Sequence, residues 1–268
     1  LSSLNKITYK REFIDKLRQK DKYTESTIQT WHKIVMRMIN AAVHNQIIPS
    51  NTLTGFKFDL SNNVRSFSKK ELQRFVAVLE NEDIQTQVIF LTLLKSGMRK
   101  GELMGLRWND IDLKKQVVNI NKTTAISTNG LTINDPKTPN SIRKISFDNK
   151  TAYILKKWKL RQREALMKKG GFKTQLIFTK IDGTMFRSQD IYQRSKRLAE
   201  KANLHSIGCH GFRHTHATLL FESDNVRSKI IQERLGHSSL QITMDTYTHI
   251  SDEVTKEATD AFSSYVNF

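Results

Sequence analysis

The chain has 268 residues, which is long enough for two domains, each with its own core. Its 44 lysines and arginines against 26 aspartates and glutamates give a formal net charge of +18, which favours a polyanionic partner such as nucleic acid. Charge alone does not separate DNA from RNA or from an anionic membrane, but no apolar run reaches membrane-spanning length. A single cysteine excludes an internal disulfide, which fits a reducing cytoplasm.

Residues 1–60 are predicted to form a small helical domain. Thr24 is placed to cap a helix on which apolar residues repeat at helical spacing. Residues 61–66 have the composition of a linker, so we place the domain boundary there and expect the second domain at 67–268. Ser68-Lys69-Lys70-Glu71 then has the spacing of a capping box and predicts the first helix of that domain.

The next segment is predicted to carry Arg99 on a rigid support. Ile84 to Leu94 is mostly apolar and indicates a buried helix, which Gly97 stops. Arg99 would therefore lie just past a helix end. Glu102 would lie on the following turn, where it can hold Arg99.

A small antiparallel sheet is predicted in the middle of the chain. Its strands are expected at Gln116–Ile120, Leu131–Ile133 and Ile142–Phe147. Asn129-Gly130 is a strong hairpin signal. Lys137 would lie in the loop between the last two strands.

Two further helices and a short strand are predicted after the sheet. Asp148 is expected to start a long helix through about Met167, and this helix is the most basic stretch of the chain. Its cations either form a solvated face or contact phosphate, and the sequence leaves both open. Leu176–Phe178 is predicted as a short strand, and Ser188 is placed to cap a helix through about Ala202.

The most informative stretch brings two histidines, an arginine and a tyrosine close together in sequence. His210 and Arg213 are three residues apart at a helix start, a position that suits a phosphate, and a guanidinium fork matches two phosphate oxygens. Gly236 is predicted to end the next helix, on which Ile230, Ile231 and Leu235 are expected to be buried, and His237 follows in the turn. Tyr247 lies ten residues later. A tyrosine phenol can be a covalent nucleophile when neighbouring groups help its proton leave.

No metal site is expected in this stretch. Cys209, His210, His214 and His216 lie close together, but their spacing fits no common zinc pattern. Cys209 is interpreted as a small buried hydrophobic residue and not as a reactive thiol. Residues 252–268 are predicted to form a terminal amphipathic helix.

Five short motifs, taken in order, resemble those of the tyrosine recombinases, and most of all the integrases of phages and conjugative transposons. The resemblance runs from about Phe67 to Tyr247. Each motif alone is short enough to arise by chance, but five in the right order are specific. They are Ser96-Gly97-Met98-Arg99-Lys100-Gly101-Glu102-Leu103, Pro136-Lys137-Thr138-Pro139-Asn140-Ser141-Ile142-Arg143, His210-x-x-Arg213, Leu235-Gly236-His237 and Tyr247-Thr248-His249.

The resemblance implies a fold and a set of partners. The fold class is mainly α with a small antiparallel β-sheet, in which a helical core-DNA-binding domain and a mixed α+β catalytic domain clamp a duplex. The implied partners are double-stranded DNA attachment sites and accessory DNA-bending or directionality factors, with a tetramer on DNA in the bacterial cytoplasm and no cofactor. The chain starts at Leu1 and not at Met, so we interpret it as a fragment or a processed chain. Relatives often carry a further small DNA-binding domain ahead of this region, and we expect this chain to have been cut after it. The C-terminal tail is left open between packing on its own domain and on a neighbouring subunit.

The resemblance also implies a role for each motif residue. One residue is the nucleophile, one protonates the leaving group, and the others bind the phosphate or assist proton transfer, with no metal. These are Tyr247 as nucleophile, Arg99 and Arg213 as ligands of the non-bridging oxygens, Lys137 as general acid, His210 as assistant to the tyrosine's proton transfer, His237 as hydrogen-bond donor to the phosphate, and Glu102 as support for Arg99.

Three functions are open from the sequence. The first is a site-specific recombinase, the second a type IB topoisomerase that reseals the same strand, and the third a DNA-binding protein that kept the fold without the catalysis. The wording of the motifs and the helical N-terminal domain favour the first, and the complete catalytic set argues against the third. Tyr265 is a rival nucleophile, but it follows no Leu-Gly-His at the right distance.

Overall fold

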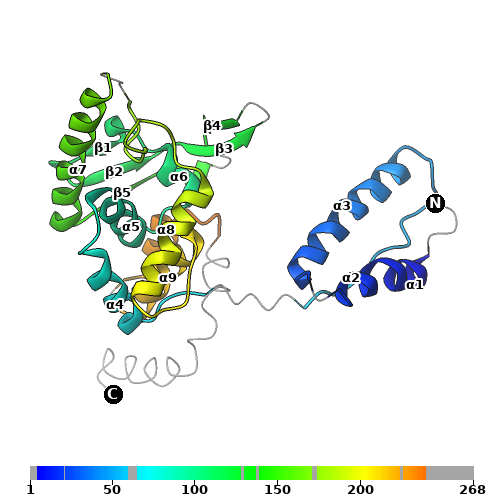
Figure 1. The fold of residues 1–268 in the computed structure, drawn as a ribbon. Coiled ribbons are helices and arrows are strands. Elements are labelled where there is room, and N and C mark those ends of the chain that lie inside the picture. Colours follow the sequence, from blue (N-terminus) through cyan, green and yellow to red (C-terminus); the bar gives the residue numbers. More distant parts are fainter. Residues whose placement is uncertain are drawn as a thin grey trace, which may run out of the picture. The chain divides into compact units, whose positions relative to one another are not determined.

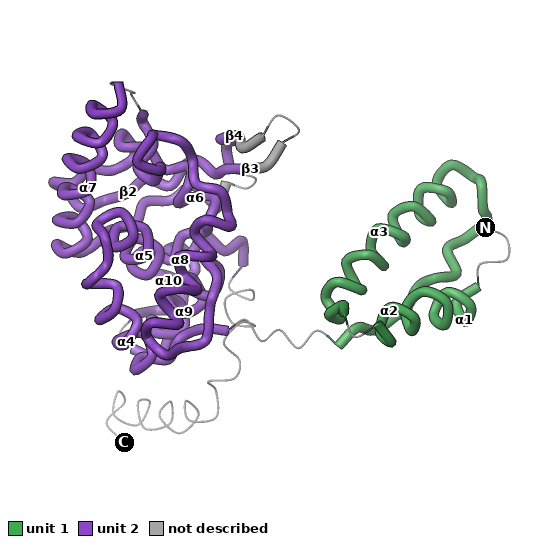
Figure 2. The backbone as a smooth tube through the Cα atoms, viewed as in Figure 1, with its two compact units in different colours: residues 1–63 green, residues 64–268 purple. Residues whose placement is uncertain are grey.

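The computed structural model describes residues 5–20, 22–59, 65–127, 130–136, 139–170, 174–223 and 226–239. The chain divides into two compact units, residues 1–63 and 64–268 (Figure 2). The functions expected of the two domains stay predictions. Lys137, Tyr247 and the predicted tail helix at 252–268 lie outside the described residues.

The first unit consists of helices followed by an extended segment. Its elements are α1 (Lys6–Tyr9), the π-helix η1 (Lys10–Asp15), α2 (Lys16–Arg18) and α3 (Glu25–His44). Thr24 caps α3 as predicted, because its hydroxyl accepts a hydrogen bond from the backbone N–H of Thr27. The apolar faces of these helices meet in a small core that includes Ile14, Ile28 and Leu53. Residues 45–59 contain no helix, so the helical prediction for this part of the chain holds only to His44.

The second unit is organised around a central buried helix. Its helices are α4 (Lys69–Leu79), α5 (Ile84–Ser96), α6 (Lys100–Gly105), α7 (Asn149–Lys168), α8 (Ser188–Lys201), α9 (Cys209–Glu222) and α10 (Ser228–Leu235), with short 3-10 helices η2 (Trp108–Asp110) and η3 (Pro139–Ser141). The apolar residues of α5 are buried because it packs against both α7 and α9 (Figure 1). Among the described helices, none has both the length and the apolar character needed to cross a membrane.

The helix starts follow local hydrogen-bonding rules. Ser68 forms the predicted capping box at α4, and Asp148 caps α7 as predicted. The start of α8 differs from the prediction. Its N-cap is Arg187 and not Ser188, because the carboxylate of Asp190 accepts a hydrogen bond from the Arg187 backbone N–H at 2.9 Å.

The strands form two antiparallel sheets instead of the single predicted one. One sheet has the order β1-β2-β5, and the other is the hairpin of β3 and β4, which projects from the body of the unit in Figure 1. The last strand pairs with β2, not β4; its buried residues alternate with exposed ones, and the strand contacts α10. The strands are β1 (Ile111–Asp112), β2 (Val117–Ile120), β3 (Thr123–Ser127), β4 (Gly130–Asn134) and β5 (Arg143–Ser146).

Two smaller predictions are wrong. Leu176–Phe178 is not a strand, because Leu176 makes only an isolated bridge with Arg107. Ile230 is exposed at 52%, because the buried face of α10 runs through Ile231 and Leu235 instead.

Gly97 ends α5 as predicted, and it fits for two separate reasons. Its φ of +62° lies in the left-handed region, which favours glycine. A Cβ at this position would lie 2.5 Å from Cδ2 of His216 and 3.0 Å from Cδ2 of Leu235. The missing side chain therefore allows α9 and α10 to approach the end of α5.

We predict that Gly97→Ala lowers the free energy of unfolding by about 2–4 kcal/mol, through backbone strain plus the clash with His216. Gly170→Ala is the matched control, since Gly170 also has a positive φ, of +97°, but a Cβ added there would meet no atom within 4 Å. The control should cost about 1 kcal/mol. Urea unfolding measures both, and equal losses would contradict the steric argument.

Candidate functional site

The predicted phosphate-binding residues come from three helix ends that meet in the second unit. Arg99 is the N-cap of α6, immediately after the end of α5. Arg213 lies in the first turn and a half of α9. His237 directly follows Gly236, whose left-handed backbone ends α10 as predicted.

The last turn of α10 holds three arginines. The final carbonyls of a helix have no partner within the helix, and they carry the negative end of its dipole. Here three consecutive carbonyls each accept a hydrogen bond from a different guanidinium. Arg143 Nε donates to Arg234 O at 2.7 Å, Arg213 Nη2 donates to Leu235 O at 2.8 Å, and Arg99 Nη2 donates to Gly236 O at 3.1 Å.

Glu102 joins two of these arginines from the opposite side. It is 3% exposed, and its carboxylate accepts two hydrogen bonds from Arg143, at 3.0 Å from Nη1 and 2.9 Å from Nη2. It also accepts from the backbone N–H of Arg99 at 2.7 Å and from its Nη1 at 3.0 Å. Burial alone would raise the pKa of Glu102, but the Arg143 and Arg99 interactions outweigh it and lower the pKa. The expected contact between Glu102 and Arg99 is confirmed.

The two predicted phosphate-binding arginines differ in exposure. The side chain of Arg99 is 41% exposed, so part of its guanidinium faces solvent. Arg213 is 3% exposed and also donates from Nη1 to the Gly97 carbonyl at 2.8 Å. Within the part of the chain that the structure describes, Arg99, Arg143 and Arg213 face one carboxylate, that of Glu102, so this cluster has an excess of positive charge, which suits an anion.

The histidines of the site are kept neutral at neutral pH. Nε2 of His210 lies 3.0 Å from Nε2 of His214, so one of these nitrogens is protonated and donates a hydrogen bond, and the other accepts that hydrogen bond. Burial, followed by the charges of Arg213 and Arg99, lowers the pKa of His210 and lowers that of His237 to about 4. Neutral imidazoles act here as hydrogen-bond donors and acceptors and add no charge to the cluster.

A further histidine lies behind the site in a fixed tautomer. Nδ1 of His216 donates to the Leu94 carbonyl at 2.7 Å, and its Nε2 accepts from Nε of Arg234 at 3.0 Å. Burial first, and then the Arg234 charge, lowers the pKa of His216 to about 3. Arg234 also donates to the Lys95 carbonyl at 2.6 Å, so this network ties α9 and α10 to the end of α5.

Sequence reasoning missed Arg143 and Arg234 as parts of the site. Arg143 had a detectable signal: it occupies an inward-facing position of the strand, in alternation with Ile145, where an unpaired cation would be costly.

Cys209 is partly buried against the core, and burial raises the pKa of its thiol to about 11, which fits the interpretation of an unreactive residue.

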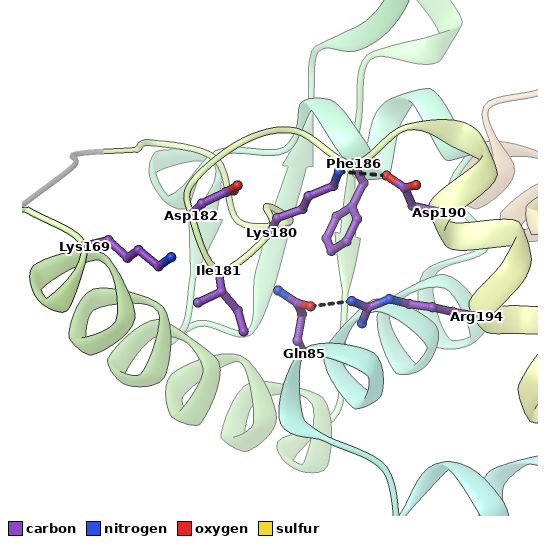
Figure 3. Close-up of a pocket in the computed structure, with 8 residues that line it drawn as sticks. All are labelled: Gln85, Lys169, Lys180, Ile181, Asp182, Phe186, Asp190 and Arg194. Carbon is purple, nitrogen blue, oxygen red and sulfur yellow. Dashed lines mark hydrogen bonds and ion pairs between the residues drawn. The ribbon is translucent and has the colours of Figure 1, made fainter.

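A separate hollow of about 640 Å³ lies between the start of α5, α8 and the segment that precedes α8 (Figure 3). The guanidinium of Arg194 stands 5.1 Å from the ring centre of Phe186 and donates to Oε1 of Gln85 at 2.7 Å. Lys180 pairs with Asp190 at 3.2 Å. None of the described catalytic candidates lines this hollow, so it is not part of the arginine site.

Comparisons with known proteins agree with this geometry. The model of the phage integrase family matches residues 65–254. A tyrosine recombinase XerC-like protein of Caldanaerobacter subterraneus is 29% identical, over 97% of this chain and 70% of the relative. The ICEBs1 integrase of Bacillus subtilis is 27% identical, over 97% of this chain and 71% of the relative. The Tn1549 transposon integrase, solved with transposon right end DNA, matches with a TM-score of 0.80 at 20% identity, over 98% of this chain and 87% of that one.

The chain belongs to the phage integrase family. It is a tyrosine recombinase, an enzyme of site-specific recombination. The fold class expected from the sequence, mainly α with small antiparallel sheets, is confirmed.

We predict that the second unit loses stability on acidification from pH 7 to pH 5. His214, His216 and His237 have folded pKa values of about 4, 3 and 4, below the ordinary 6.5, so the unfolded chain binds more protons in this window. The stability is complete above pH 6.5 and declines as the pH falls, by about 1–2 kcal/mol for His216 at pH 5. Thermal melting against pH measures this. His216→Gln should give a shallower slope, and a flat wild-type profile would contradict the assignment.

Proposed function

We propose that this chain cuts and rejoins DNA at the attachment sites of a mobile element, through a covalent bond between Tyr247 and the 3′ phosphate. The observation that supports this best is the end of α10, where Arg99 and Arg213 are anchored on the two carbonyls immediately before His237. Three groups suited to one phosphate are thereby gathered at one point. The DNA-bound Tn1549 integrase has the same fold, which supports duplex DNA as the substrate.

In the proposed cleavage step, the phenolic oxygen of Tyr247 attacks the scissile phosphorus, and the bond from phosphorus to the 5′ oxygen breaks. The tyrosine's proton passes toward His210, and Lys137 gives a proton to the departing 5′ oxygen. The product is a 3′-phosphotyrosine and a free 5′ hydroxyl, so no external energy source is needed.

Charge develops on the non-bridging oxygens during this attack. The guanidinium of Arg99 is exposed enough to contact these oxygens. Arg213 is buried behind it and contributes its positive charge, and neutral His237 adds a hydrogen bond. The pentacovalent transition state has one more negative charge than the phosphodiester. The excess positive charge of the cluster therefore stabilises the transition state more than the ground state.

Recombination follows when the 5′ hydroxyl of a second duplex attacks the phosphotyrosine. Two duplexes have four strands to cut, so four nucleophiles, and hence a tetramer on DNA, are proposed. Accessory DNA-bending or directionality factors are further proposed partners, and the proposed location is the bacterial cytoplasm. A type IB topoisomerase would use the same first step, but the XerC-like and ICEBs1 relatives are a recombinase and an integrase.

We predict that Tyr247→Phe keeps DNA binding within about threefold and loses all covalent adduct, because only the nucleophilic oxygen is removed. The protein is incubated in EDTA with fragmented DNA of a mobile element and its host, then denatured, and the linked DNA is sequenced. Tyr265→Phe is the matched control and should form adduct normally. An adduct that persists in Tyr247→Phe and disappears in Tyr265→Phe would overturn the assignment.

We also predict a steep salt dependence of DNA binding. Each neutralised phosphate contributes about −0.9 to the slope of log affinity against log salt, and a clamp over several phosphates should give a slope of about −5 or steeper. Fluorescence anisotropy of a labelled duplex between about 50 and 250 mM salt measures this slope.

The same titration of the variants Lys156→Gln and Lys157→Gln tests whether α7 contacts DNA. A slope equal to that of wild type means that the basic face of α7 is solvated, and a shallower slope means that it contacts phosphate. A flat wild-type response would contradict the clamp.

A further inference from the structure

We propose that Arg143 is a positioning residue for strand cleavage, which fixes the guanidinium of Arg99 by binding the same carboxylate, that of Glu102, and a neighbouring carbonyl in the same last turn of α10. Among the described residues, the guanidinium of Arg99 donates to the carboxylate of Glu102 and to the carbonyl of Gly236. Arg143 donates hydrogen bonds to that same carboxylate and to the Arg234 carbonyl in the same turn of α10. The inference rests on the proposed function of Arg99 as a phosphate ligand.

We assign Arg143 a positioning role because all three of its guanidinium nitrogens donate to protein groups. Its side chain is 6% exposed, and its donors are turned to protein groups. Nη1 and Nη2 grip the two oxygens of Glu102, Nε donates to Arg234 O at 2.7 Å, and Nη1 also donates to Ser141 O at 3.0 Å. We therefore infer that Arg143 acts on DNA through Glu102 and the last turn of α10.

Arg143 also fixes the chain just downstream of Lys137. A Cβ on Gly236 would lie 3.0 Å from Nη1 of Arg143 and 3.0 Å from the carbonyl oxygen of Asn140, so these groups pack directly on the end of α10. Asn140 is three residues after Lys137 in the sequence. The same turn of α10 thus anchors the base of the segment that carries the proposed general acid.

The geometry requires a planar fork at this position. One guanidinium binds a carboxylate in a bidentate manner on one edge and a helix carbonyl on another, whereas a lysine ammonium offers its donors from a single nitrogen. Arg143→Lys therefore keeps the charge that compensates Glu102 but cannot hold the carboxylate and the α10 turn together. Glu102 and Gly236 are then free to shift, and Arg99 shifts with them.

The test is a double-mutant cycle on single-turnover cleavage of the attachment-site duplex recovered by covalent trapping. We expect Arg143→Lys to lower the cleavage rate by about 10- to 100-fold, as misplacement of a transition-state ligand does, with DNA affinity within about threefold of wild type. In an Arg99→Lys background the same change should cost less than about threefold, because the group through which Arg143 acts is already altered. Equal losses in the two backgrounds, or a wild-type rate in Arg143→Lys, would overturn the proposal.

Two further variants separate positioning from general damage to the fold. Arg194→Lys changes a guanidinium that hydrogen-bonds Gln85 and Thr86 away from the cluster, and it should cleave at the wild-type rate. Glu102→Gln combined with Arg143→Gln leaves neither buried charge unpaired, so it should fold even if Arg143→Lys does not. We expect this double variant to show the same loss of cleavage; wild-type cleavage by it would contradict the proposal.

An NMR experiment that requires no cleavage activity separates the positioning role of Arg143 from the proposed cleavage function. Side-chain 15N NMR of the arginines, without DNA, reports whether the Nη–H groups of Arg99, which donate to Glu102 and to the Gly236 carbonyl, are protected from exchange with water. We expect this protection to fall in Arg143→Lys and to persist in Arg194→Lys, and an unchanged Arg99 signal would refute the positioning role. If wild type forms no adduct, the proposed function fails, while the NMR comparison still decides whether Arg143 positions Arg99.

Discussion

The rest of the site depends on the way α10 ends. A helix end exposes carbonyls that need donors, and here three consecutive carbonyls obtain them from arginines on other elements. The same hydrogen bonds that complete the helix also fix the guanidinium groups. Stability and the preorganisation of the site are therefore properties of one set of contacts, and a change at the last turn of α10 affects both.

The electrostatics of the cluster follow from this crowding. Three guanidinium groups around one helix end repel one another, and Glu102 is the buried carboxylate that compensates them in part. Among the described residues the compensation is incomplete, which favours the binding of an anion. An anion that binds the folded chain but not the unfolded one also stabilises the fold. We therefore infer that DNA binding and the order of this region are thermodynamically linked.

The elements that sequence reasoning predicted correctly are those whose determinants are local. Gly97 as a helix stop and the contact of Glu102 with Arg99 follow from spacing within a few residues of the chain. The pairing of β5 with β2 does not, because these two strands are separated along the chain by the β3–β4 hairpin. The inward-facing position of Arg143 is a local signal that was overlooked, but its partner Arg234 lies 91 residues away and follows from no local pattern.

The separation of these partners along the chain has a consequence for synthesis. Arg99 and Gly236 are 137 residues apart, and Arg213 and Gly97 are 116 apart. A growing chain that has not yet reached the end of α10 already contains Arg99, Arg143 and Arg213 but has no helix end to hold them. We infer that an unfinished polypeptide on the ribosome cannot assemble the phosphate-binding cluster, so a potential to break DNA strands arises only with a nearly complete catalytic unit.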